Sequence, residues 1–395
     1  MISFPSAVSA AAAQPPSEVT LPPAINEFLA VAQMNPDYNA ERIRKTFEYV
    51  FRYEDRLLAL PGQYFHMPCN DQIQSLHVVP DYGIFFDTEI QIYDVAHKTI
   101  SLAVLYSKGD FQLLARHAGH FGVRINHQQL TQNELPILRR ISGCERFVKH
   151  IHDYVTQFDF YLYQEYVGGD SFVDLIDNKY ISPQHRKQYI CDLLEGVEYL
   201  FKNRIVHSDI KPDNLLLTDK GRLKITDFEL SFSLDRPKEQ IGGTVEYCAP
   251  ELLDKTPGLV YHKLDSFSVG TTCVMFCTMN ETRWYGLSRD STLVPQRTPA
   301  IQQYVTLLHD RAGPVDRLSV DRLFEGLLQV NPADRWDASQ AYTYACKLKQ
   351  KHFVKWQCPA PPTPRVNRSL SSLSDVVLRL SLNGANPASD QNPSP

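Results

Sequence analysis

A segment in the middle of the chain, HSDIKPDNLLLTDKGRLKITDFEL at 207–230, carries polar residues whose types and spacing suit phosphoryl transfer. Its second half, GRLKITDF, alternates apolar and polar residues as a strand does, and NLLLTDKG predicts a preceding strand with a turn at 219–221. Such a hairpin would hold Asp209, Asn214 and Asp227 close together. Mg²⁺ bridges the phosphate oxygens in this chemistry and prefers carboxylate, amide and water oxygens as ligands. A further carboxylate would orient the attacking hydroxyl group.

The composition limits the kind of protein that could carry this segment. The chain has 395 residues, of which 43% are hydrophobic and 22% charged, and this is ordinary for a soluble globular protein with one large or two medium domains. The longest apolar run, VGTTCVMFC at 269–277, is too short to cross a bilayer, and the N-terminus lacks the basic start of a secretory signal. The net charge of −5 offers no footprint for nucleic acid or anionic membrane.

The cysteines point to a compartment. All eight are scattered without CxxC pairs or clusters typical of metal sites, so we expect buried thiols in a reducing environment. The expectation is therefore a soluble, intracellular protein with no nucleic-acid or membrane partner. The cytoplasm and the nucleus are not distinguished.

The elements that must position the polar residues follow from a division of the chain into four parts. Residues 1–22, rich in Ala, Ser and Pro, and the Pro/Ser-rich tail 356–395 are expected to be disordered. A helical extension is expected at 23–75, and residues 76–355 combine short β segments with a long helical stretch. The extension contains a helical pattern with its apolar residues on one face: Ile43, Phe47, Val50, Phe51, Leu57 and Leu58. This helix either packs on the main domain, which we favour, or binds a separate partner.

Four landmarks in order resemble the eukaryotic-type protein kinases over residues 76–355. HSDIKPDN resembles their catalytic loop, followed by DFE where DFG is usual, and GGTVEYCAPE resembles the segment that ends in APE. DSFSVG and NPADRWDA supply Asp265, which would brace the catalytic loop, and Arg335, which would pair with Glu251. The resemblance implies an α+β, bilobal fold. Its small lobe (76–163) would hold an antiparallel β-sheet and one main helix, and a hinge (164–168) would lead to a mainly α-helical large lobe (169–355).

The resemblance also implies roles for the polar residues. Asp209 would accept the proton of the substrate hydroxyl, Lys211 would lie beside the γ-phosphate, and Asn214 and Asp227 would hold Mg²⁺ or Mn²⁺. Thr244 matches the threonine that contacts the catalytic aspartate and lysine in serine/threonine kinases. The substrate would then be a Ser or Thr hydroxyl of a protein.

ATP binding is expected to involve both lobes. Gly83 would begin the phosphate-covering loop, and Glu134 matches a helix glutamate that normally pairs with an ATP-anchoring lysine. The adenine would meet the Glu165 carbonyl and the Val167 N–H of the hinge. Three apolar residues would sandwich the base, unless they are plain core residues: Ile90, Ala103 and Leu216.

Several positions depart from the family pattern. Leu105 stands where the ATP-anchoring lysine is expected, Lys108 should face the other side of the strand, and Lys98 should lie further away. Ser208 replaces an arginine that reads activation-loop phosphate, and Glu229 replaces a glycine and is expected to help hold a second cation. The sequence predicts a serine/threonine protein kinase with weakened ATP anchoring. The alternatives are a pseudokinase that acts as scaffold or allosteric partner, and a small-molecule phosphotransferase.

Overall fold

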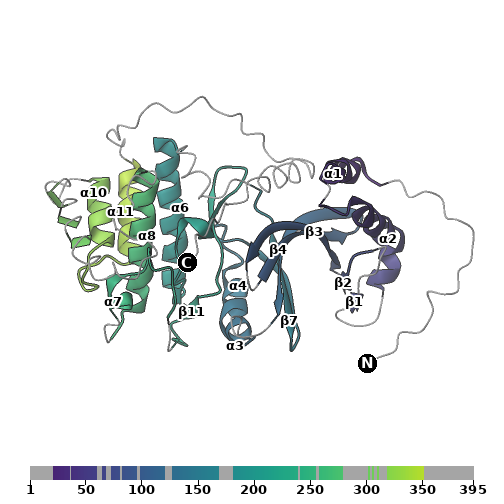
Figure 1. The fold of residues 1–395 in the computed structure, drawn as a ribbon. Helices are drawn as coiled ribbons and strands as arrows, with labels where there is room; N and C mark the ends of the chain where they lie inside the picture. The colour runs from purple at the N-terminus through teal and green to yellow at the C-terminus, as the bar shows by residue number, and fades with distance from the viewer. Residues whose placement is uncertain are drawn as a thin grey trace, which may run out of the picture. The chain divides into compact units, whose positions relative to one another are not determined.

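The computed structural model describes residues 21–350 except for a set of gaps (Figure 1). The gaps are 36, 60–64, 68–72, 81, 96–97, 121–126, 169–180, 239–240, 255–257, 279–300, 303–304, 307–308 and 311–317. The disorder expected for 1–22 and 356–395 concerns residues that, except for 21 and 22, lie outside this description.

The chain forms two compact units whose boundaries lie within strands. The first contains the described residues up to Tyr93 together with Ser101–Leu114, and the second contains Asp94–Ile100 and the described residues from Ala115 onward. Three strands, β3 (Gly83–Val95), β4 (Lys98–Ser107) and β5 (Asp110–His120), contribute residues to both units. The expected boundaries at 163, 168 and 355 remain predictions.

The first unit combines two helices with one end of a sheet. Its helices are α1 (Pro23–Gln33) and α2 (Ala40–Leu58), and its strands follow the order β1 (Phe65–Met67), β2 (Leu76–Val79), β3, β4 and β5. Antiparallel pairing joins β1 to β2 and β2 to β3, with Leu76 opposite Phe86.

Helix α2 begins at an Asn cap and packs on this sheet. The side chain of Asn39 accepts a hydrogen bond from the N–H of Arg42, which satisfies a free amide of the first turn. Phe47 is buried, with its ring centroid 5.0 Å from that of Phe86 and 6.2 Å from that of Phe28. This packing supports the first of the two interpretations of the helix. Phe51, predicted on the same helical face, is 38% exposed, and its ring centroid lies 6.2 Å from that of Tyr106.

The second unit contains the other end of the sheet and a short helical segment. Strands β7 (Asp159–Glu165) and β6 (His150–Val155) follow β5 in the sheet order. Helix α3 (His127–Gln129) continues through one π turn (Leu130–Glu134) into α4 (Leu135–Ile141). Pro136 lies in the first turn of α4 and has no N–H to donate to the preceding turn, so the wider π turn forms there.

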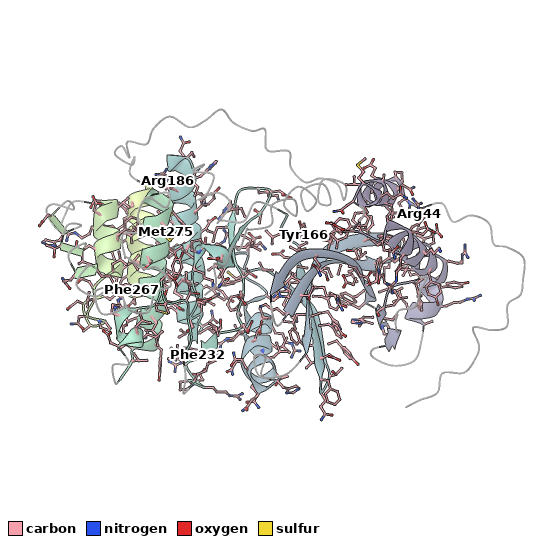
Figure 2. The ribbon with its side chains drawn as sticks, in the orientation of Figure 1. Arg44, Tyr166, Arg186, Phe232, Phe267 and Met275 are labelled. Carbon is pink, nitrogen blue, oxygen red and sulfur yellow. The ribbon has the colours of Figure 1, made fainter. Side chains whose placement is uncertain are left out.

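Among the described residues of the second unit, more are helical than extended. Helix α6 (Pro183–Lys202) begins at Ser182, whose hydroxyl accepts from the N–H of His185, and α8 (Tyr261–Thr278) lies against it. Figure 1 shows α6, α8, α10 (Val320–Leu327) and α11 (Ala338–Gln350) as a bundle. Arg186 of α6 donates to the carbonyl of Cys277 at 3.0 Å, which ties α6 to the end of α8 (Figure 2).

The segment with the expected catalytic residues lies between α6 and α8 in the sequence. It contains β8 (Ile205–Val206), a 3-10 turn (Pro212–Asn214), β9 (Leu215–Leu217), β10 (Leu223–Ile225), β11 (Phe232–Ser233) and α7 (Pro250–Leu253). The predicted hairpin is confirmed, because β9 and β10 pair antiparallel with Leu217 opposite Leu223. Gly221 closes its turn with a φ of +67°, which glycine adopts without strain.

The expected fold class is confirmed: the chain is an α+β protein with an antiparallel sheet and a larger, mainly helical part. A search of the described helices found none with the length and apolar content needed to span a membrane.

Candidate active site

The catalytic loop is held from beneath by a buried carboxylate. Asp265 of α8 accepts the N–H of His207 at 2.7 Å and the N–H of Ser208 at 2.9 Å. Ser208 has a φ of +74°, a left-handed conformation that is costly for a residue other than glycine. The two bonds to Asp265 therefore hold a strained backbone in place, which confirms the bracing role expected for this aspartate.

Asp209, Lys211 and Thr244 form a connected group above this brace. One carboxylate oxygen of Asp209 accepts the N–H of Thr244 at 2.8 Å, and the other lies 3.1 Å from Lys211 Nζ. Lys211 Nζ also donates to Thr244 Oγ1 at 2.9 Å. Burial lowers the pKa of Lys211, but the charge of Asp209 and its hydrogen bond outweigh burial, so that the pKa is raised. Thr244 thus contacts both residues, as the sequence predicted.

Asn214 and Asp227 offer hard oxygen ligands beside this group. The side-chain amide nitrogen of Asn214 donates to the backbone oxygen of Asp209 at 2.8 Å and to its carboxylate at 3.2 Å, which leaves the amide oxygen to serve as a ligand. Burial raises the pKa of Asp227. The charge of Lys98, together with the other neighbours of Asp227, outweighs burial, so the pKa is lowered. An ionised carboxylate and an amide oxygen are ligands that fit Mg²⁺.

Lys98, at the start of β4, reaches this carboxylate. Its Nζ lies 3.4 Å from Asp227 Oδ1 and 3.0 Å from Glu229 Oε2, and all three residues belong to the second unit. Burial lowers the pKa of Lys98, yet the charges of Asp227, Glu229 and Glu134 raise it above the ordinary value. The expectation that Lys98 lies far from the site was wrong. Lys98 is the first residue of β4, where a long side chain can extend beyond the strand end. The alternation of residues along a strand does not predict the direction of such a side chain.

The carboxylate of Glu229 lies against the ammonium group of Lys98. The expected role of Glu229 in holding a second metal ion remains a prediction. Glu229 has no left-handed φ, so a side chain at this position does not strain the backbone.

Glu134 and His117 lie in a small cavity with Lys98. The remaining lining residues are Leu130, Phe160, Leu162 and Glu229. Burial raises the pKa of Glu134 to about 8. The charge of Lys98 lowers this pKa, and the charges of Asp227 and Glu229 raise it further. Burial lowers the pKa of His117 to about 3, and the Lys98 charge adds to this. Both shifts favour the uncharged form, which is the protonated carboxyl group for Glu134 and the neutral imidazole for His117. The sequence did not single out His117, because no motif marks it.

Four residues expected near the nucleotide belong to the first unit. Gly83 lies against Leu105, since a Cβ added to this glycine would be 2.5 Å from Leu105 Cδ1. Ile90 and Ala103 are completely buried, which agrees with the open alternative that they are core residues. Leu105, assigned to the lysine position from its sequence context, lies in β4 within the first unit, whereas Lys98 at the start of the same strand belongs to the second. The nucleotide-binding roles of Gly83, Ile90 and Ala103 remain predictions.

The expected hinge and base-contacting residues lie in the second unit. The N–H of Glu165 donates to the carbonyl of Lys149 at 2.9 Å, and the Glu165 carboxylate pairs with Lys224. Val167 and Leu216 are half-buried. These contacts position Glu165, and its contact with adenine, like those of Val167 and Leu216, remains a prediction.

The activation segment is tied to the catalytic loop by neutral hydrogen bonds. Ser208 Oγ donates to the carbonyl of Gly242 at 2.8 Å, at the position where an arginine would read a phosphate. Beyond it, the expected ion pair forms: Arg335 donates to Glu251 through two bonds of 2.7 and 3.0 Å. The Arg335 guanidinium carbon also lies 5.0 Å from the ring centroid of Phe267 in α8, which is labelled in Figure 2.

The comparisons with known proteins agree with this geometry. The family described as protein kinase domain matches residues 122–345, more than half of the chain. The chain belongs to this family. The match begins after β5, so it includes the catalytic segment but not Leu105 or Lys98.

Three relatives show how distant the similarity is. The chain is 26% identical to serine/threonine-protein kinase STK11 of Gallus gallus over 67% of this chain and 60% of that protein. It is 27% identical to the liver/testis phosphorylase b kinase gamma catalytic chain of Bos taurus over 54% and 53%. It is 29% identical to a calcium/calmodulin-dependent protein kinase kinase of Caenorhabditis elegans over 53% and 38%. The aligned part thus covers less than two thirds of each relative.

Proposed function

We propose that this kinase-family protein is an active serine/threonine protein kinase, which transfers the γ-phosphoryl group of ATP to a hydroxyl group of a protein. The connected arrangement of Asp209, Lys211 and Thr244 carries this proposal. A scaffold protein has no chemical need for a carboxylate, a cation and a threonine that contact one another beside two oxygen ligands.

Each residue has one task in the proposed reaction. Asp209 accepts the proton of the substrate hydroxyl while the hydroxyl oxygen forms a bond to the γ-phosphorus. At the same time the bond between that phosphorus and the bridging oxygen of ADP breaks. Lys211 offsets negative charge on the transferred group, because its Nζ is already held at 3.1 Å from Asp209. When bound, Mg²⁺ or Mn²⁺ neutralises phosphate charge, and Asn214 and Asp227 would hold it.

The preference for Ser and Thr rests on Thr244 and on the relatives. The Thr244 hydroxyl fills the space beside Lys211 and Asp209, in agreement with the serine/threonine resemblance. The relative from Gallus gallus is named a serine/threonine-protein kinase. A protein substrate also follows from the family.

We expect this activity to be independent of activation-loop phosphorylation. Ser208 cannot pair with a phosphate as arginine does, and its hydroxyl already binds the carbonyl of Gly242. The segment between Asp227 and Glu251 is therefore connected to the catalytic loop without any phosphate.

A phosphate-transfer assay on the purified full chain tests the function. Labelled ATP with Mg²⁺ or Mn²⁺ is incubated with mixed protein substrates, and the labelled residue type is determined. Asp209→Asn should lower the transfer rate by about 100-fold or more, the scale of a lost general base. Asp213→Asn is the matched control, since Asp213 is exposed in the same loop. Equal rates for Asp209→Asn and the wild type, or no transfer by the wild type, would support the pseudokinase alternative.

A further inference from the structure

We propose that Lys98 binds the nucleotide phosphates and that Glu229 holds it in position, so that this pair replaces the lysine–glutamate pair expected at 105 and 134. The inference rests on the proposed kinase function. It assigns a phosphate-binding residue and a positioning residue.

Lys98 has the location that a phosphate-binding cation requires. Its ammonium group lies 3.4 Å from the carboxylate of Asp227, the expected metal ligand, and its side chain is only 13% exposed. A cation beside the metal ligand lies where phosphate charge would gather. In the part of the chain that the structure describes, no other lysine or arginine forms an ion pair with Asp227.

The neighbouring positive groups are committed elsewhere or uncharged. Lys238 donates to the carbonyl of Leu230 at 2.8 Å, and burial lowers its pKa to about 8. His117 lines the same cavity and is neutral, as described above. Lys211 is held by Asp209 and Thr244. Lys98 is therefore the group best placed to take the part of the missing lysine.

Glu229 contacts Lys98 directly, whereas Glu134 acts on it from a distance. The Lys98 Nζ to Glu229 Oε2 distance is 3.0 Å. Among the described residues, Lys98 forms ion pairs with Asp227 and Glu229 but none with Glu134. Burial also favours the protonated form of Glu134, which makes it a weaker partner for a lysine than an ionised carboxylate.

The backbone of Glu229 is fixed by a neighbouring element. Gln129, at the end of α3, donates through Nε2 to the carbonyl of Glu229 at 2.6 Å and to that of Ser231 at 3.4 Å. The carboxylate therefore projects from an anchored loop. A lysine held by an anchored carboxylate loses little further freedom when it binds a ligand.

One ammonium group can serve both partners. A lysine Nζ carries three N–H donors, so it can remain bonded to Glu229 while it donates to a phosphate oxygen. Asp227, which shares Lys98 in the structure, is then available to the metal. Glu229 stays with the lysine throughout and does not need to ligate a metal.

A double-mutant cycle on nucleotide binding tests the pair. ATP affinity with Mg²⁺ is measured by calorimetry for Lys98→Met, Glu229→Gln and the double variant. Lys98→Met should weaken binding by about 10- to 100-fold, the scale of a charged hydrogen bond. Glu229→Gln should weaken it about 3- to 30-fold in the wild type and hardly at all beside Lys98→Met, because Glu229 acts through the lysine.

Two further cycles provide the comparison. The pair of Lys98→Met with Glu134→Gln should show clearly weaker coupling than the pair with Glu229→Gln. The surface pair Lys202 and Glu198 of α6, joined at 2.7 Å, is the matched control, and Lys202→Met with Glu198→Gln should leave ATP affinity unchanged. Melting temperatures of the ATP-free variants show whether the Lys98–Glu229 pair already couples without nucleotide.

The outcomes separate this inference from the proposed function. ATP binding that follows the predicted cycle, without detectable phosphate transfer, would retain the pair and reject the kinase activity. Phosphate transfer together with wild-type ATP affinity in Lys98→Met would reject the pair alone. Coupling of Lys98 to Glu134 instead of Glu229 would also overturn it, as would a wild-type protein that binds no ATP.

Discussion

The region around Asp209 and the region around Lys98 both place charged groups for phosphate chemistry, but they are built differently. Around Asp209, the partners Lys211 and Asn214 lie within five residues in the chain, and a hairpin and a brace from Asp265 hold them. Around Lys98, the partners Asp227 and Glu229 lie 129 and 131 residues away. Short spacings can be recognised in a sequence, whereas long-range ion pairs depend on how strands and turns are arranged. The first region could therefore be recognised from the sequence, whereas the second could not.

The largest effect should come from the architecture beneath the first region. Glu251→Ala would leave the Arg335 guanidinium buried without its carboxylate, and Arg335 is 1% exposed. We expect the free energy of unfolding to fall by about 3–5 kcal/mol, measured by urea denaturation. Replacement of both partners, by Glu251→Leu and Arg335→Met, should restore much of this loss. A double variant as unstable as Glu251→Ala would show that the ion pair itself is not the cause.

A smaller effect should come from the threonine that joins the catalytic residues. Thr244→Val removes the hydroxyl that accepts from Lys211 Nζ at 2.9 Å but keeps the backbone N–H bond to Asp209. We expect kcat to fall by about 2- to 10-fold, the scale of one hydrogen bond, with little change in the KM for ATP. Thr244→Ser should recover the rate. A large loss in Thr244→Ser would instead indicate a role for the methyl group.

The buried carboxyl group of Glu134 should affect the pH dependence of stability. The pKa of Glu134 is raised from 4.5 to about 8, so the folded protein keeps a proton that the unfolded chain releases. Its contribution to stability therefore falls as the pH rises between these two values. Glu134→Gln stays neutral and should lose less of its melting temperature over this window.

The matched control for this experiment is Glu145→Gln, because the side chain of Glu145 is 91% exposed. It should follow the wild-type pH profile. A Glu134→Gln profile that is parallel to the wild type would show that Glu134 ionises normally in the folded protein.

The smallest effect is expected at the position where the sequence places the ATP-anchoring lysine. Leu105→Lys should change ATP affinity by less than about twofold, because Leu105 packs on Gly83 in the first unit and Lys98 already supplies a cation. The change is measured by calorimetry with Mg²⁺. Tightening by tenfold or more would support the assignment of the lysine position to Leu105.

Much of the fold and of the catalytic segment could be predicted because the signals are local. The hairpin of β9 and β10 follows from alternation and a glycine turn, and α2 follows from its helical period. The Asp265 brace and the Glu251–Arg335 pair came from ordered motifs, and their contacts are confirmed. Each of these needs only a spacing or a landmark.

The rest of the site could not be predicted for physical reasons. Lys98 and Leu105 lie on the same strand, β4, so which of its residues supplies the cation depends on how the strand is placed in three dimensions. The side chain of Lys98 extends from a strand end, and the strand pattern does not say where such a side chain points. The lowered pKa of His117 arises from burial among residues of β4, the π turn, β7 and the loop that carries Glu229, which no motif records.

The π turn at Leu130–Glu134 changes the direction in which side chains project before and after it within a single helical segment. Such a turn contains one residue more than an α turn, so the residues before it are rotated by about 100° relative to the residues after it. Gln129 lies before the turn and donates a hydrogen bond to the carbonyl of Glu229. Leu138 and Ile141 lie after the turn and are buried in the core. Loss of one residue within 130–134 would turn Gln129 away from Glu229 while the core side of α4 stayed in place. The one extra residue therefore allows a single helical segment to contact the Glu229 loop with Gln129 and to pack into the core with Leu138 and Ile141.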